Sequence, residues 1–495
     1  MKDQILNLKP ANIWKHFYAM TQIPHPSGYM NEITKFVEDF GKGLGLETIR
    51  GEAGNICIRK PATKGYENKQ AIVLQSHVDM VPQANSDLDF NFETDPIQPY
   101  IDGEWVKAKG TTLGADNGIG CAAMMAILED NTIEHGPIEA LFTTDEETGM
   151  YGAFAVTPGL INGKILLNLD GEEYGEIYIG CAGGADVTAR FQYQNETFIP
   201  KEDVAVKVSL KGLKGGHSGV DVHLGRANAN KLLFRFLKDA MDTYGARLSE
   251  VKGGSLRNAI PREAFAVIIV DGKDKYERIK QMAAAYDEIF KQEFDGIEDI
   301  TKMSFTAEFM EVSKDMVLIP MEVQERLIHA IVAAPNNVIN MSPQVPTAVQ
   351  TSINLAMVET TDSMAEIKML ARSSSETKKK ALCSSEESLF KLAKADFAET
   401  SNEYPGWDPA PDTKIVPIMK KLYKEQEGEE LNVEIIHAGL ECGIIMSKVP
   451  DLKLDAVAFG PTIKFPHSPD EKVNIPSVER FWNYLLAILK NAPEN

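Results

Sequence analysis

The order of strands and helices in the first part of the chain restricts its fold more than any other feature. Between Asn55 and Gly180, short apolar runs that favour strands alternate with helical segments. The expected strands lie near residues 55–59, 71–76, 138–144 and 164–169, and one expected helix runs over residues 117–129. Strands that alternate with helices form a mostly parallel sheet with helices on both faces. We therefore expect an α/β domain.

The middle of the chain has a different pattern. Strand-like alternation at 186–193 and 203–211 is followed by helical stretches at 226–241, 274–293 and 384–398, with further strands between them. This order is typical of a separate α+β domain. The last segment returns to the α/β pattern, with strands near 432–436 and 454–460. We predict one domain formed by residues 1–185 and 401–495, with residues 186–400 inserted as a second domain.

The composition excludes several classes of partner. The formal net charge is −21, whereas nucleic acids and anionic membranes bind basic surfaces. No run approaches the ~18 apolar residues that span a bilayer, and the N-terminus lacks the apolar core of a signal peptide. The five cysteines are scattered and odd in number, which is typical of reduced thiols. We expect a cytoplasmic protein that binds neither nucleic acid nor membrane.

Acidic residues and histidines stand where the expected strands end. They are His77 and Asp79, Asp116 at the start of a helix, Glu146 and Glu147, Asp170, and His467. Each alone has an ordinary alternative, because a His-x-Asp sequence is often a surface turn and a Glu-Glu pair is often a solvated face. Together they favour a site, since open α/β sheets bind ligands at the carboxyl ends of their strands and unpaired buried charge is costly. The set predicts a dinuclear metal site and a metal-assisted hydrolase.

The chemistry of such a site explains the residue types. A two-metal hydrolase needs a bridging carboxylate, terminal ligands and one unligated base, and two ions about 3.5–4 Å apart hold the attacking hydroxide. Glu146 and Glu147 are adjacent, so that one can bind metal while its neighbour serves as the base. Asp79 can accept the second ring N–H of His77 and so fix the tautomer of that ring.

Several blocks of the sequence resemble a known family. The blocks His77–Asp79, Gly114–Gly118, Asp145–Gly149, Asp170 and Pro466-His467 resemble the dinuclear-zinc metallopeptidases that include carboxypeptidase G, aminoacylases and carnosinases. Three further segments are similar to the bacterial aminoacyl-histidine dipeptidases: residues 253–264, 437–443 and 467–471. This resemblance covers essentially the whole chain. The 437–443 loop departs from the carboxypeptidase-G and tripeptidase branches, in which this loop tends to be Gly-Gly-Thr-like. The resemblance implies an α/β catalytic domain with an inserted α+β lid, and a homodimer formed through the lid.

The same resemblance implies roles for the residues at the strand ends. Asp116 would bridge two Zn²⁺ ions, with Co²⁺ or Mn²⁺ as substitutes; His77 and Asp170 would complete one site, and Glu147 and His467 the other. Glu146 would be the general base. The implied activity is hydrolysis of dipeptides with broad specificity, including Xaa-His. An N-acyl amino acid deacylase or a carboxypeptidase is the alternative. A non-catalytic binding protein is disfavoured because the base and the full ligand set are present.

Other residues are candidates for contacts with the substrate. His217, in Gly215-Gly-His-Ser-Gly219, is either a turn histidine or, by the resemblance, the donor that stabilises the oxyanion. Asn258 could donate to the same oxyanion or to the substrate backbone. Arg372 suits a substrate carboxylate, because its guanidinium binds carboxylates in bidentate fashion. On the loop after strand 432–436, His437 is a further binding candidate, and Glu441 could bind the free amino group of a dipeptide.

Overall fold

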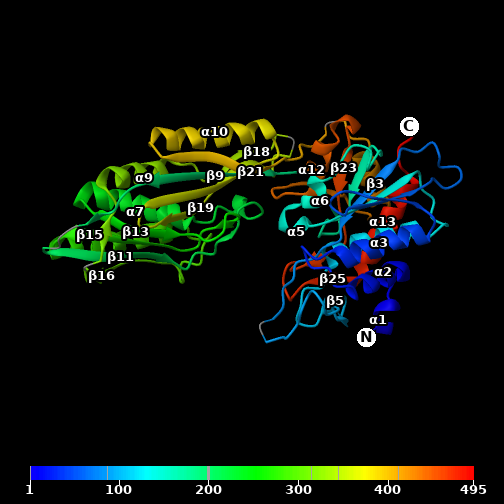
Figure 1. Cartoon of the computed structure of the whole chain (residues 1–495), viewed down its shortest axis with the longest axis horizontal. Coiled ribbons are helices and arrows are strands. Elements are labelled where there is room, and N and C mark those ends of the chain that lie inside the picture. The colour runs from blue at the N-terminus through cyan, green and yellow to red at the C-terminus, as the bar shows by residue number, and fades with distance from the viewer. Residues whose placement is uncertain (1, 86, 198–200, 314, 344, 411) are drawn as a thin grey trace. The chain divides into compact units, whose positions relative to one another are not determined.

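The computed structural model describes residues 2–85, 87–197, 201–313, 315–343, 345–410 and 412–495. The chain forms two compact units (Figure 1). The main unit comprises Met1–Gly180, Trp407–Ile435 and Leu440–Asn495, and the inserted unit comprises Cys181–Gly406 and Ile436–Gly439. The units thus divide at Gly180 and Gly406, whereas the sequence pattern suggested boundaries at 185 and 400. The short segment Ile436–Gly439 also belongs to the inserted unit.

The main unit is built on an eight-stranded sheet with the order β1-β2-β6-β3-β7-β23-β8-β22. The strands are β1 (Glu47–Arg50), β2 (Ile56–Lys60), β3 (Ile72–His77), β6 (Ile138–Thr143), β7 (Ile165–Asn168), β8 (Glu176–Cys181), β22 (Asn432–Ile436) and β23 (Asp455–Ala458). The central strands β6, β3, β7 and β23 are parallel. Every residue of β3 and β6 is buried, as in a sheet covered on both faces.

Helices complete the core of this unit. They are α1 (Lys2–Leu6), α2 (Ala11–Thr21), α3 (Asn31–Gly43), α4 (Ala115–Glu129), α5 (Glu146–Gly149), α6 (Tyr151–Phe154), α11 (Ile415–Glu427), α12 (Glu441–Lys448) and α13 (Ile475–Lys490). Apolar side chains of α2, α4 and α13 pack with the central strands in a single cluster. Nearly every residue of α4 is buried, because this helix contacts both β3 and α2.

A second, antiparallel sheet of the main unit was not expected from the sequence. Its order is β24-β25-β5-β4, formed by β4 (Pro99–Asp102), β5 (Trp105–Ala108), β24 (Ile463–Lys464) and β25 (Lys472–Asn474). The connection between β24 and β25 carries His467. This sheet therefore sets the position of a segment that contains one of the candidate ligands.

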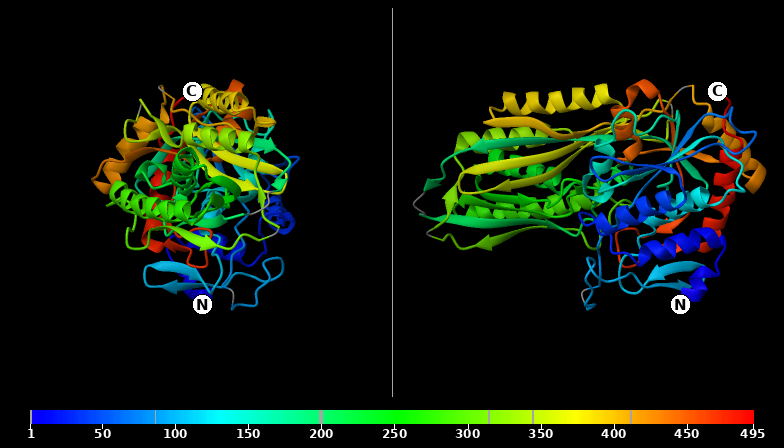
Figure 2. Two further views of the ribbon diagram at one scale, coloured as in Figure 1. Left: turned by 90° about the vertical axis from the view of Figure 1, so that its left-hand side faces the viewer. Right: turned by 45° about the vertical axis from the view of Figure 1, so that its right-hand side comes forward.

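The inserted unit contains a nine-stranded antiparallel sheet whose long strands lie side by side in Figure 2. Its main path is β16-β11-β15-β13-β19-β20-β9-β21, and β18 pairs with β19. The strands are β9 (Gly183–Gln192), β11 (Asp203–Lys211), β13 (Arg247–Gly253), β15 (Ala264–Asp271), β16 (Ser304–Met310), β18 (Asn337–Met341), β19 (Val349–Thr360), β20 (Met364–Ser373) and β21 (Phe397–Tyr404). Helices α7 (Ala229–Tyr244), α8 (Lys273–Glu293), α9 (Met321–Ala333) and α10 (Glu376–Leu392) share one apolar core with the strands.

The expected α/β class with an inserted α+β domain is confirmed. The helix expected at 384–398 is wrong in its bounds, because α10 begins at Glu376 and Phe397 already belongs to β21. Strand pairing overrides the helical pattern there, since β21 pairs with β9. In the part of the chain that the structure describes, no helix is long and apolar enough to cross a bilayer.

Candidate metal centre

Parallel strands of the main unit deliver the candidate ligands to one edge of the sheet. His77 is the last residue of β3, Glu146 and Glu147 begin α5 just after β6, and Asp170 follows β7. Strand β3 pairs with both β6 and β7, so the carboxyl ends of all three strands are neighbours. Asp116 lies in the first turn of α4.

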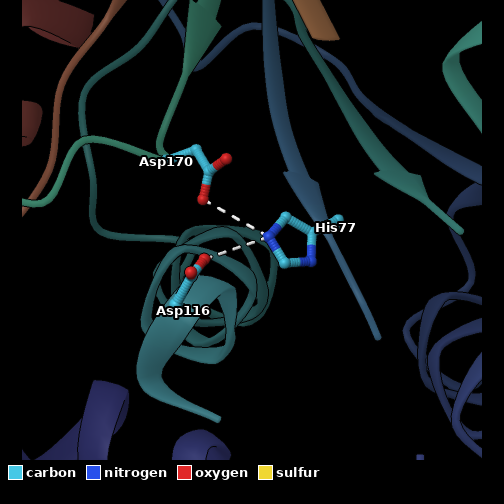
Figure 3. A group of neighbouring side chains, drawn as sticks. All are labelled: His77, Asp116 and Asp170. Atoms are coloured by element: carbon cyan, nitrogen blue, oxygen red, sulfur yellow. Dashed lines mark hydrogen bonds and ion pairs between the residues drawn. The ribbon is translucent and has the colours of Figure 1, made fainter. Parts of the chain in front are cut away.

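Asp116 lies between two groups of candidate ligands. In the first group, the Nε2 atom of His77 is 3.1 Å from Oδ1 of Asp116 and 3.4 Å from Oδ1 of Asp170 (Figure 3). In the second, the Nε2 atom of His467 is 3.2 Å from Oδ2 of Asp116 and 2.9 Å from Oε2 of Glu147. Each oxygen of Asp116 thus faces a different histidine, which is the arrangement of a carboxylate that bridges two ions.

A third grouping includes the expected base. Ligand atoms of His77, Glu146 and Glu147 also lie within 4.8 Å of one another. Glu146 thus belongs to one such group, whereas Glu147 belongs to two. Distance alone does not separate a ligand from a base here, and the division of labour between them stays a prediction.

The electrostatics of the cluster suit a cation. Burial raises the pKa of Asp170 to about 6, with the nearby Asp116 carboxylate adding to the effect. Burial also raises the pKa of Glu146 well above its usual value. Burial alone would lower the pKa of His77, but the carboxylates of Asp170, Asp116 and Asp79 raise it well above its usual value. The four carboxylates of the candidate ligand groups outnumber the two histidines, so negative charge remains in excess.

The donor set fits a pair of divalent ions. Oε1 of Glu147 is buried without a hydrogen-bond partner, which leaves an acceptor free for a ligand. Carboxylate oxygens and imidazole nitrogens together suit Zn²⁺ and similar borderline cations. A positive ion in each group would offset the buried carboxylates. The residues present therefore fit two metal ions.

Asp79 holds the turn that carries Glu146 and Glu147. Its Oδ1 accepts a hydrogen bond from the main-chain N–H of Glu146 at 3.1 Å. Its Oδ2 accepts from the main-chain N–H of Glu147 at 3.3 Å and from the Ser27 hydroxyl at 2.8 Å. The Nδ1 atom of His77 is 3.0 Å from the main-chain carbonyl of Asp79 and 3.5 Å from its carboxylate. The main-chain carbonyl of Asp79 is therefore the nearer acceptor for the His77 ring. Ser27, which donates to the Asp79 carboxylate, was not among the residues that the sequence singled out.

Glu441 lies in the interior of the main unit, in contact with the central strands. Its Oε2 accepts hydrogen bonds from Nε2 of Gln75 at 2.5 Å and from Oγ1 of Thr143 at 2.8 Å. Burial raises the pKa of this carboxyl to about 7, and its Oε1 has no hydrogen-bond partner. The side chain is 1% exposed, so a contact with the amino group of a substrate stays a prediction.

His217 is held in one tautomer by the main chain of the inserted unit. It lies in β12 (Gly216–His217), which pairs with β14 (Ala259–Ile260). Its Nδ1 accepts hydrogen bonds from the N–H groups of Gly219 at 3.2 Å and Val220 at 3.0 Å. Burial, and then the charge of Arg372, lower the pKa of His217 to about 4. The ring is therefore neutral at pH 7, with its proton on Nε2.

The other candidates of the inserted unit form a partly unsatisfied polar group. Arg372 is 4% exposed and donates from Nη1 to the Tyr404 hydroxyl at 2.8 Å, while its Nε has no partner. The Nε2 atom of His437 lies 2.7 Å from Oγ of Ser352, which stands opposite Arg372 across β19 and β20. Burial, and then Arg372, lower the pKa of His437 to about 3. Asn258 is exposed, and its carbonyl accepts from the N–H of Ser218 at 2.8 Å.

His437 and Glu441 are close in sequence, but they belong to different units. His437 lies with Ser352 in the inserted unit, whereas Glu441 lies in the core of the main unit. The expectation that both lie on one loop is wrong, because Glu441 is the first residue of helix α12.

Comparison with known proteins identifies the family. The chain belongs to peptidase family M20/M25/M40, whose family model matches residues 73–491, and the resemblance seen in the sequence is confirmed. It is 44% identical over 491 residues to the cytosol non-specific dipeptidase of Escherichia coli K12, which covers 99% of each chain. The crystal structure of aminoacylhistidine dipeptidase from Vibrio alginolyticus matches with a TM-score of 0.90 and 44% identity, over 99% of this chain and 98% of that chain. Aminopeptidase PepT from Bacillus cereus matches with a TM-score of 0.56 and 17% identity, over 98% of each chain, which shows the fold alone.

Proposed function

We propose that this protein is a metal-dependent dipeptidase that hydrolyses the peptide bond of dipeptides, with broad specificity that includes Xaa-His. The observation that carries the proposal is the position of Asp116, whose two oxygens face His77 and His467 separately. The identity of 44% to a dipeptidase over nearly the full length of both chains supports the choice of substrate class.

In this proposal His77, Asp116 and Asp170 hold one ion, and Asp116, Glu147 and His467 hold the other. The ions would be Zn²⁺, with Co²⁺ or Mn²⁺ as substitutes, because the donors are carboxylates and imidazoles. When bound, such ions polarise the scissile carbonyl and lower the pKa of a water molecule.

Glu146 is the proposed general base. Its carboxylate would take a proton from the attacking water and pass it to the nitrogen of the leaving amine. Asp79 would keep this side chain in place, since it accepts hydrogen bonds from the main chain of both Glu146 and Glu147. The main-chain carbonyl of Asp79 would orient the ring of His77.

The substrate contacts follow the available donors. His217 would donate from Nε2 to the developing oxyanion, and Arg372 would bind the C-terminal carboxylate with its free Nε. Asn258 and His437 would contact the substrate backbone, and Glu441 would bind its amino group. We further propose that the protein is cytoplasmic and forms a homodimer through the inserted unit, which we call the lid in this context.

A panel of dipeptides, each compared with its N-acetylated form, tests the activity on protein whose metal content has been measured. We expect turnover of the free dipeptides, with about two metal ions per chain. The Glu146→Gln variant is the control for contaminating peptidases. Turnover of N-acetyl amino acids in place of dipeptides would instead make the protein a deacylase.

A further inference from the structure

Glu471 makes an unusual set of contacts close to the candidate metal centre. Its side chain is 2% exposed, and it accepts hydrogen bonds from four consecutive main-chain N–H groups. Oε2 accepts from Leu113 at 2.7 Å and Gly114 at 3.1 Å, and Oε1 accepts from Ala115 at 2.8 Å and Asp116 at 3.3 Å. The carboxylate is thus enclosed by the turn that ends at Asp116.

This turn needs a partner for its N–H groups. Gly114 has a φ of 70°, in the left-handed region, and Asp116 has φ −81° and ψ 105°, in the extended region, so the chain is not helical at these two residues. Buried main-chain N–H groups are costly to leave unpaired. A carboxylate is well suited to the task, because its two oxygens only accept hydrogen bonds and its charge strengthens each of them.

The carboxylate also joins two segments that each carry a candidate ligand. Glu471 is in the same connection between β24 and β25 as His467. On the other side of this contact, the Nε2 atom of His467 faces Oδ2 of Asp116 at 3.2 Å. The relative position of the two ligands therefore depends on a contact between Glu471 and the main chain of Asp116 and the residues before it, which involves neither ligand side chain.

We infer that Glu471 is a positioning residue that holds Asp116 in register with His467 and thereby sets the affinity of the protein for the metal pair. The inference rests on the proposed metal centre. Outer-shell partners of metal ligands commonly contribute about 10–100-fold to metal affinity. An amide cannot replace the carboxylate, since its NH₂ group would point at N–H donors.

Glu139 offers a matched control within the main unit. Its carboxylate is also buried, and it accepts hydrogen bonds from the main-chain N–H groups of Asn162 at 2.7 Å and Gly163 at 3.0 Å. Glu139 lies in β6, and its partners among the described residues are Arg59, Asn162 and Gly163. None of them is a candidate ligand, so the loss of Glu139 tests general destabilisation alone.

The experiment titrates metal-free protein with Zn²⁺ in competition with a chromophoric chelator, and records thermal unfolding of the same metal-free samples. We expect Glu471→Gln to bind Zn²⁺ about 10–100-fold more weakly than the wild type. Glu139→Gln should be destabilised but should retain the wild-type affinity. Glu471→Asp keeps the charge on a shorter side chain and should weaken binding less than Glu471→Gln does.

Wild-type affinity in Glu471→Gln, or an equal loss of affinity in Glu139→Gln, would overturn the inference. If Glu471→Gln does not fold, Glu471→Asp decides, and an affinity equal to that of the wild type would then overturn it. A wild-type protein that takes up no Zn²⁺ would instead refute the metal centre of the proposed function, which is a separate outcome.

Discussion

Replacement of His217 tests whether the inserted unit takes part in the proposed reaction. Two main-chain N–H groups point at its Nδ1, so the proton of the neutral ring lies on Nε2. Burial, and then the charge of Arg372, lower the pKa of His217 to about 4, so the ring is neutral at pH 7. The ring is therefore prepared to donate one hydrogen bond from Nε2 without a change of protonation.

We expect His217→Ala to lower kcat about 10²–10³-fold, which is the usual loss when one oxyanion donor is removed. KM should change less, because the contact forms mainly in the transition state. His217→Gln places an amide near the position of Nε2 and should restore part of the activity. His217→Asn places its amide near Nδ1, where two N–H donors already point, and should not.

Steady-state kinetics with one dipeptide at pH 7, together with metal analysis of each variant, measure these effects. The metal content should stay constant, because all candidate ligands lie in the main unit. An unchanged kcat with a raised KM would make His217 a binding residue only. Loss of metal would show that a ligand had been misassigned, and equal activity of the Asn and Gln variants would refute the tautomer argument.

Three further predictions concern the metal centre and the lid. Glu146→Gln should lower kcat about 10²–10⁴-fold with metal retained, whereas Glu147→Gln should also lower the metal content. Near-normal turnover by Glu146→Gln would exclude Glu146 as the base. A chelator should abolish activity and Zn²⁺ should restore it, and full activity of protein shown to be metal-free would refute the metal centre. Burial raises the pKa of Glu386 to about 7. As the pH rises from 4.5 to 7, the unfolded chain therefore loses this proton before the folded protein does. The free energy of unfolding should fall by about 3 kcal/mol across that range. Glu386→Gln should remove this contribution, and thermal unfolding at pH 5 and pH 8 that shows the same pH dependence in both proteins would contradict the assignment.

The sequence by itself determined the fold class and which residues are candidates at the strand ends. Apolar runs of strand length that alternate with helices leave few arrangements other than a parallel sheet. The ends of its neighbouring strands then meet, so the sequence alone places His77 and the Glu146-Glu147 pair at one edge of the sheet, and the pairing of β3 with β6 agrees. Patterns of this kind are local, since each strand carries its own periodicity and its own terminal residue.

Only the tertiary structure decided the contacts between distant segments. Glu471 meets the N–H groups of residues 113–116 across more than 350 positions of the chain, and the strands that bring it there are as short as two residues. The carboxylate of Asp79 accepts a hydrogen bond from the main chain of Glu146, and the carboxylate of Glu441 accepts one from Gln75 in the interior of the main unit. A buried carboxylate takes whichever donors the packed chain presents, and those donors are main-chain groups that exist at every residue except proline. The sequence therefore does not show which N–H groups a given carboxylate will accept from, and only the folded chain does.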